Sequence, residues 1–185
     1  MPRPESGVEY EDTYPYKLQA KGYEVICRSK RTNDTKIQSS EQNLLDDIIY
    51  LKPHIVIIHL GIVDCAPRIF TRFESRVLSV MPSFVRNPII GFASKHRSFI
   101  TKVRQISYTT VKEFSKNLQI IVEESLKVAR LVVIIKILKT VDLNEKRSFN
   151  FNKKIEEYNK TIDDVIRLFK TKEVCQKKVV ILIDP

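Results

Sequence analysis

The stretch IVIIHLG, residues 55–61, decides the fold class. Five of its first six residues are apolar, with His59 the exception, and three isoleucines and one valine favour a strand. A continuous β-branched run that ends in glycine is typical of a strand buried on both faces of a parallel sheet. We therefore expect residues 55–60 to form a central strand, with ligand-binding groups just beyond its carboxyl end.

Apolar spacing on both sides of this run predicts that strands and helices alternate along the chain. The predicted strands cover 23–28, 55–60, 131–137 and 179–183. The predicted helices begin at Ser39, with Gln42 completing a capping box, and at Asp64, Tyr108 and Asn150, while 83–107 is expected to be a long connection with some helix. Such alternation predicts the α/β class, a parallel sheet with helices on both faces.

The composition fits a single globular domain over residues 1–185. Hydrophobic residues make up 43% and charged residues 29%, with four glycines, so the class of disordered or low-complexity chains is excluded. The apolar runs are far shorter than the ~18 to 20 residues that span a bilayer. Residues 1–7 also lack the apolar core of a secretory signal. We therefore expect no membrane span and, by default, a cytoplasmic location.

The net charge of +10 is concentrated in one segment. Residues 65–111 carry eight Lys and Arg residues and a single acidic residue, Glu74. Such a segment can meet nucleic acid, anionic lipid headgroups or an acidic glycan, and the alternative is the solvated surface of a basic protein. Because the chain has no zinc-finger spacing, RNP-type aromatic motif or recognisable helix-turn-helix, nucleic acid is not the expected partner.

The cysteines and histidines predict neither a metal site nor a bound cofactor. The three cysteines lie far apart in the sequence and form no CxxC pair. His54 and His59 are five residues apart, so in one strand they would point to opposite faces of the sheet. His59 is expected to be a core side chain, and His96, between two basic residues, a solvated one.

Two motifs point to a family. The sequence GIVDCAPR, residues 61–68, resembles the third sequence block of SGNH/GDSL hydrolases, in the form seen in members associated with bacterial polysaccharide biosynthesis. The sequence YEDTYPYKL, residues 10–18, is similar to the Tyr-Pro-x-x-Leu segment that follows the nucleophile block of this family, and residues 52–57 resemble the approach to block three. The resemblance covers nearly the whole chain and implies a flavodoxin-like three-layer sandwich with ester hydrolase or acyl transferase activity.

The chain departs from the family pattern at both ends. No Gly-Asp-Ser nucleophile block occurs in it, and it stops at Asp184-Pro185, before the Asp-x-x-His block. The resemblance therefore implies a single SGNH-hydrolase-like domain, residues 1–185, that is truncated at both ends and holds no catalytic residue. It also implies that the central strand carrying the nucleophile, between 23–28 and 55–60, is missing.

Four residues are candidates for the site. Gly61 matches the glycine of block three, and Asn33, with Ser29 as the alternative, is assigned to the oxyanion loop of block two. Asp64 is expected to cap a helix, to lie at the mouth of the cleft, or both. Arg68 is expected either to bind a substrate carboxylate or phosphate through its bidentate guanidinium group or to be a surface residue.

Two hypotheses for the function follow. The first is an SGNH/GDSL-type hydrolase that acts on an acylated glycan and is inactive as this chain, because the catalytic triad is absent. The second is a non-catalytic module that binds an acidic glycan or another polyanion through residues 65–111. The sequence makes no prediction about the oligomeric state.

Overall fold

The chain forms two compact units, Met1–Asn33 and Asp34–Pro185. The computed structural model describes residues 9–28, 33–172 and 179–184. The first unit contains the 3₁₀ helix η2 (Tyr10–Asp12) and helix α1 (Tyr14–Ala20), and residues 23–28 form neither helix nor strand. The predicted strand over 23–28 is therefore wrong. Tyr23 and Ile26 are both more than half exposed, so the segment lacks the buried side chains that a sheet strand supplies.

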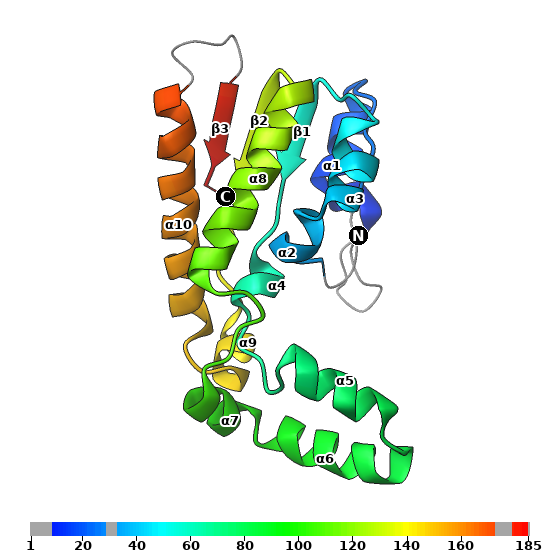
Figure 1. The fold of residues 1–185 in the computed structure, drawn as a ribbon, viewed down its shortest axis with the longest axis vertical. Helices are drawn as coiled ribbons and strands as arrows, with labels where there is room; N and C mark the ends of the chain where they lie inside the picture. The colour runs from blue at the N-terminus through cyan, green and yellow to red at the C-terminus, as the bar shows by residue number, and fades with distance from the viewer. Residues whose placement is uncertain (1–8, 29–32, 173–178, 185) are drawn as a thin grey trace. The chain divides into compact units, whose positions relative to one another are not determined.

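The second unit contains a parallel three-stranded sheet, which confirms the predicted α/β class. The strands are β1 (Ile55–Ile58), β2 (Leu131–Ile135) and β3 (Val179–Ile183), in the order β1-β2-β3 (Figure 1). The central strand is β2, with Val132 to Ile134 buried, and β1 lies at the edge of this sheet. The expectation that 55–60 is central and buried on both faces is thus wrong, since Ile55 and Ile57 are exposed.

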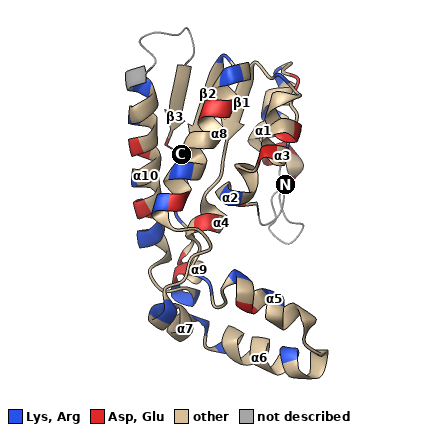
Figure 2. Cartoon of the chain, in the orientation of Figure 1, with Lys and Arg blue, Asp and Glu red and all other residues tan. Residues whose placement is uncertain are grey.

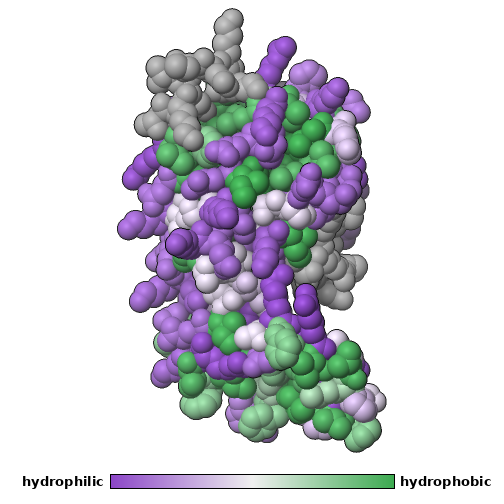
Figure 3. Space-filling model, viewed as in Figure 1, coloured by the Kyte–Doolittle hydropathy of each residue, from purple (hydrophilic) through white to green (hydrophobic). Residues whose placement is uncertain are grey.

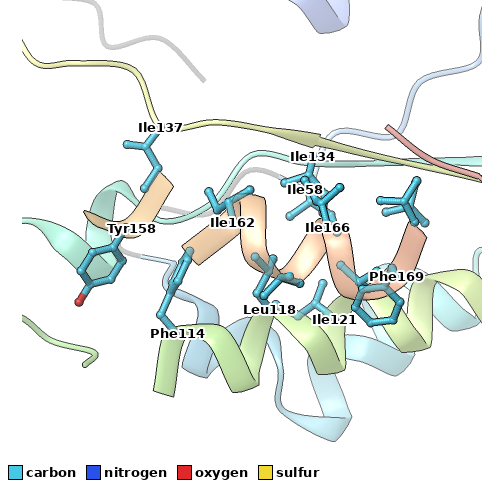
Figure 4. Close-up of a cluster of buried hydrophobic side chains, with 14 of the residues drawn as sticks. Ile58, Phe114, Leu118, Ile121, Ile134, Ile137, Tyr158, Ile162, Ile166 and Phe169 are labelled. Atoms are coloured by element: carbon cyan, nitrogen blue, oxygen red, sulfur yellow. The ribbon is translucent and has the colours of Figure 1, made fainter. Parts of the chain in front are cut away.

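Two long helices cover one face of the sheet. Helix α8 (Val111–Val128) connects β1 to β2, and α10 (Phe151–Lys172) connects β2 to β3. Both connections step across the sheet in the same direction, and right-handed crossovers then place both helices on the same face. Figure 4 shows the shared core, in which side chains of the strands point toward α8 and α10: Ile58, Phe114, Leu118, Ile121, Ile134, Tyr158, Ile162, Ile166 and Phe169.

The opposite face of the sheet is exposed along the two outer strands, whereas Val133 of the central strand, on the same face, is buried. The outer positions of these two strands have exposed fractions of 37% to 47%: Ile55, Ile57, Val179, Ile181 and Ile183. These residues alternate along β1 and β3 with side chains that belong to the core, as the two-residue period of a strand requires. Within the described residues, the outer strands β1 and β3 are therefore covered on one face, and the third layer of the sandwich stays a prediction.

Short helices precede the sheet. They are α2 (Thr35–Gln38), α3 (Glu41–Leu44) and the π-helix η3 (Leu45–Ile49). The Asp34 carboxylate caps α2 by accepting a hydrogen bond from the backbone N–H of Ile37 at 2.9 Å. The helix predicted from Ser39 is present, but its capping box is not, because α3 begins after Ser40, whose side chain makes no cap hydrogen bond.

Between β1 and α8 the chain forms four helices. They are α4 (Ile62–Cys65), α5 (Arg72–Val80), α6 (Ser83–Lys95) and α7 (Arg97–Arg104), and α9 (Asp142–Arg147) follows β2. Residues 72–104, which we call the helical arm, lie beyond the carboxyl ends of the strands (Figure 1). The stretch 83–107, expected to be a connection with some helix, is mostly helical.

Candidate functional site

The site begins at Gly61, just after β1. Gly61 has φ +117° and forms the N-cap of α4. A Cβ atom at this position would lie 2.5 Å from Cδ1 of Ile137 and 3.3 Å from Cε2 of Phe114. Both the left-handed backbone and the close approach therefore require glycine.

We expect the Gly61→Ala substitution to lower the free energy of unfolding by about 2 to 4 kcal/mol, since it adds backbone strain and overpacks the core. Gly91→Ala is the matched control, because Gly91 lies within α6 and nothing lies within 4 Å of its added Cβ. The control is expected to be neutral or to stabilise by up to about 1 kcal/mol. Urea unfolding followed by circular dichroism measures both, and equal effects of the two substitutions would contradict the role assigned to Gly61.

Asp64 is fully buried and serves as an internal acceptor. Its two carboxylate oxygens accept hydrogen bonds from the backbone N–H of Thr35 at 3.1 and 3.2 Å, and Oδ1 accepts one from the Thr35 hydroxyl at 2.7 Å. The expectation that Asp64 caps the following helix is wrong. Asp64 lies inside α4, and the Thr71 side chain caps α5. Its carboxylate instead ties α4 to the start of α2.

The assignment of Asn33, or of Ser29, to the oxyanion loop stays a prediction. Asn33 is the last residue of the first unit, whereas Gly61, Asp64 and Arg68 belong to the second. Ser29, the alternative to Asn33, lies outside the described residues. The geometry of the candidate site is therefore that of the second unit alone.

Arg68 lies against an aromatic ring. The centre of its guanidinium group is 4.2 Å from the ring centroid of Tyr108, and its Nη2 donates a hydrogen bond to the Val63 carbonyl at 3.0 Å. The Arg72 guanidinium lies 5.0 Å from the same centroid and pairs with the buried Asp34 carboxylate. The aromatic face of Tyr108 thus orients two arginines at one place.

A third arginine connects this place to α9. Arg97 donates from Nη2 to the carbonyl of Pro67 at 3.0 Å and from Nε to the Ser148 hydroxyl at 2.9 Å. Pro67 directly precedes Arg68 and Ser148 directly follows Arg147, so the Arg97 side chain joins two backbone segments that each carry another arginine. Burial lowers the pKa of Arg97, and the positive charges of Arg147 and Arg68 lower it further. Positive charge is therefore concentrated beyond the carboxyl end of β1. We call these residues the arginine cluster: Arg68, Arg72, Arg97 and Arg147, together with Tyr108.

Cys65, beside this cluster, is unsuited to nucleophilic catalysis. Its side chain is fully buried, and burial together with the Asp64 charge raises the pKa of the thiol to about 12, although Lys154 and Arg68 act in the opposite direction. A thiol with that pKa is protonated at neutral pH and does not attack a carbonyl carbon.

The side chains of the three histidines are exposed. The expectation that His59 is a core residue is wrong, because β1 ends at Ile58 and the His59 side chain is exposed. His96 is exposed as expected, and its ring contacts Phe92 with a centroid distance of 4.6 Å. In the part of the chain that the structure describes, no group of three or more His, Cys, Asp or Glu side chains is placed to hold a metal ion.

The sequence names Arg68 as a candidate site residue, and Arg72 only as one of the basic residues of 65–111 that could bind an acidic glycan. Arg72 and Arg97 belong to the basic segment 65–111. The sequence does not show that they lie near Arg68, because a basic residue in such a segment could equally face solvent. Tyr108 and Arg147 carry no local signal, because Tyr108 meets Arg68, and Arg147 acts on Arg97, across a long sequence separation.

Comparisons with family models, with curated proteins and with solved structures find no match for this chain. The resemblance to SGNH/GDSL hydrolases therefore stays a prediction from the motifs.

Proposed function

We propose that this protein binds an acidic glycan at the arginine cluster, on a domain of the SGNH/GDSL-hydrolase type. The observation that supports the proposal is that Arg97 bonds to Pro67 and Ser148, the chain neighbours of Arg68 and Arg147, and that the two charges that shift its pKa, those of Arg147 and Arg68, are both positive. Like charges held together raise the free energy of the folded state, and an anion placed among them lowers it. Carboxylate and phosphate groups match the planar donor fork of arginine.

Arg68 is the residue best placed to contact the ligand. It is half-buried, and its orientation is fixed by the Tyr108 ring and by the hydrogen bond to the Val63 carbonyl. Its Nε atom is buried and has no hydrogen-bond partner among the described residues. A ligand oxygen that reached this donor would satisfy a polar group whose burial otherwise costs about 1 to 3 kcal/mol.

The place of the cluster also supports the proposal. In open α/β folds, ligands bind beyond the carboxyl ends of the parallel strands, and the residues 61–68 that carry the family resemblance begin there. The same placement supports ester hydrolysis or acyl transfer on a glycan as the second candidate function. The sequence supplies no Gly-Asp-Ser block for that chemistry, and the Cys65 thiol does not replace it.

Binding of polygalacturonate, measured by isothermal titration calorimetry at low ionic strength, tests the proposal. We expect binding that weakens as salt is added, and a loss of about tenfold in affinity for both Arg68→Gln and Arg147→Gln. Arg68→Lys keeps the charge but loses the planar fork, so its affinity should lie between those of the wild type and Arg68→Gln. The matched control is Lys153→Gln, which removes one exposed positive charge from α10 and should leave binding unchanged.

Absence of binding at low ionic strength would refute the proposal, as would an equal loss of affinity in the Lys153→Gln control. Tighter binding of duplex DNA than of polygalacturonate, sensitive to the same arginines, would replace the glycan by a nucleic acid. For the second candidate, we expect the 185-residue polypeptide to show no hydrolysis of p-nitrophenyl acetate. Turnover that a serine-reactive phosphonate abolishes would show that this expectation is wrong.

A further inference from the structure

The helical arm exposes an unusual number of large apolar side chains. Six of them have exposed fractions between 66% and 82%: Phe73, Val80, Phe84, Phe92, Phe99 and Val103. Figure 3 shows hydrophobic side chains gathered over α5 and α6, below the mostly hydrophilic surface of the sheet and its helices. An exposed apolar surface of this kind marks a site of interaction with a protein or a membrane.

These side chains follow helical spacing. Phe73, Val77 and Val80 are at positions i, i+4 and i+7 of α5, and Phe99 and Val103 are at i and i+4 of α7. Each helix therefore presents an apolar stripe on one side. Such stripes normally face the core of a protein, but most of these side chains face solvent.

An open apolar groove continues the same surface. It has a volume of about 560 Å³ and is lined by Ile69, Phe70, Pro88, Ile89, Phe92 and Ile100, among others. The Arg104 side chain also lines the groove, and its guanidinium donates to the Glu74 carboxylate at 2.7 and 3.0 Å.

The arm is also strongly basic (Figure 2). Residues 72–104 contain seven Lys and Arg residues and one acidic residue, Glu74, which is paired with Arg104. Arg76 and Lys95 are exposed beside the apolar stripes. Exposed phenylalanine side chains flanked by arginine and lysine are typical of helices that lie in the interface of a membrane.

We propose that the helical arm docks on the surface of an anionic lipid membrane, with its phenylalanine side chains inserted among the headgroups. No helix in the described residues is long and apolar enough to cross a bilayer, so the arm lies on the surface and does not span it. The positive charge of the arm favours a membrane over a second copy of this protein as the surface that it binds. A second copy would bring an equally basic arm against this one, whereas anionic headgroups complement its charge at about 1 kcal/mol per Lys or Arg.

Co-sedimentation of the full chain with vesicles tests this inference. The vesicles are phosphatidylcholine alone or phosphatidylcholine with about 30% phosphatidylglycerol, at low and at high salt. We expect binding to the anionic vesicles, a partition coefficient lower by at least about tenfold on the neutral vesicles, and weaker binding at high salt.

Two double variants separate the apolar from the electrostatic contribution. Phe84→Ser/Phe92→Ser removes two exposed rings, and Arg76→Glu/Lys95→Glu reverses two exposed charges; each should lower the partition coefficient by about tenfold or more. Tyr50→Ser is the control for the rings, since Tyr50 is 69% exposed and lies outside the arm. Lys153→Glu/Lys160→Glu on α10 is the control for the charges. Both controls should bind vesicles like the wild type.

Failure to bind anionic vesicles at low salt would overturn the inference, as would wild-type binding by both arm variants. Sedimentation velocity adds an independent outcome: a dimer that Phe84→Ser/Phe92→Ser dissociates, with no vesicle binding, would assign the arm to a second copy. Since none of the substituted residues belongs to the arginine cluster, loss of vesicle binding with intact polygalacturonate binding would keep the two proposals distinct.

Discussion

Replacing Asp64 by alanine is expected to lower the free energy of unfolding by about 2 to 5 kcal/mol. The substitution removes the acceptor of the Thr35 backbone N–H and of the Thr35 hydroxyl, both of which are buried. Each buried donor left without a partner costs about 1 to 3 kcal/mol, out of a total stability of ~5 to 15 kcal/mol. Among the described residues, the Thr35 hydroxyl then only accepts a long hydrogen bond from the Asn117 amide, at 3.4 Å, and its own proton has no acceptor.

Urea unfolding at neutral pH measures this loss. Asp164→Ala is the matched control, because the Asp164 side chain is exposed on α10 and pairs only weakly with Arg167, at 3.7 Å. The control should change the free energy of unfolding by less than about 0.5 kcal/mol. If Asp64→Ala were no more destabilising than Asp164→Ala, the structural role of the buried carboxylate would be refuted.

The loss of stability caused by Asp64→Ala is expected to depend on pH. Burial raises the pKa of Asp64 above its ordinary value, although hydrogen bonds from Thr35 act to lower it. The folded state then binds the proton more tightly than the unfolded state, so the free energy of unfolding rises as the pH falls toward the folded-state pKa. Alanine does not titrate. We therefore expect the gap between wild type and Asp64→Ala to widen from neutral pH to about pH 5, and a gap that narrows would contradict the raised pKa.

The parts of the fold that could be predicted from the sequence are those with strong local periodicity. Helices α8 and α10 carry apolar stripes over many turns, and β2 and β3 are β-branched runs that follow them, so their type and order were correct. The predicted central position of β1 is wrong for a physical reason. An unbroken apolar run shows that a strand is hydrophobic on both faces, but not that both faces are covered.

The site was harder to predict than the fold. Asp64 stands just before a helical pattern, and this local signal for a cap outweighed any sign of its true partner, Thr35, which lies 29 residues earlier. The place of Arg68 after β1 makes it a candidate, but its neighbours Tyr108 and Arg97 are brought there by contacts between segments far apart in the sequence. Such contacts have no pattern along the chain.

Apolar side chains of β1 and β3 are exposed on the outer face of the sheet. We expect the isolated 185-residue polypeptide to unfold in a broad, weakly cooperative transition and to aggregate, because an apolar sheet face and the edge strand β1 are open among the described residues. The double substitution Ile57→Thr/Ile181→Thr places two hydroxyl groups on that face and keeps β-branched side chains in both strands. It should raise the temperature at which static light scattering begins to increase.

Ile134→Thr is the matched control for this experiment. It makes the same chemical change in the same sheet, but Ile134 points into the core and is 1% exposed. A hydroxyl buried there without a partner costs about 1 to 3 kcal/mol, so the control should begin to aggregate at a lower temperature than the wild type. The two kinds of substitution should shift the onset of aggregation in opposite directions, because they lie on opposite faces of the sheet. A sharp two-state melt of a soluble monomer, unchanged by Ile57→Thr/Ile181→Thr, would show that the exposed face does not limit the solubility of this chain.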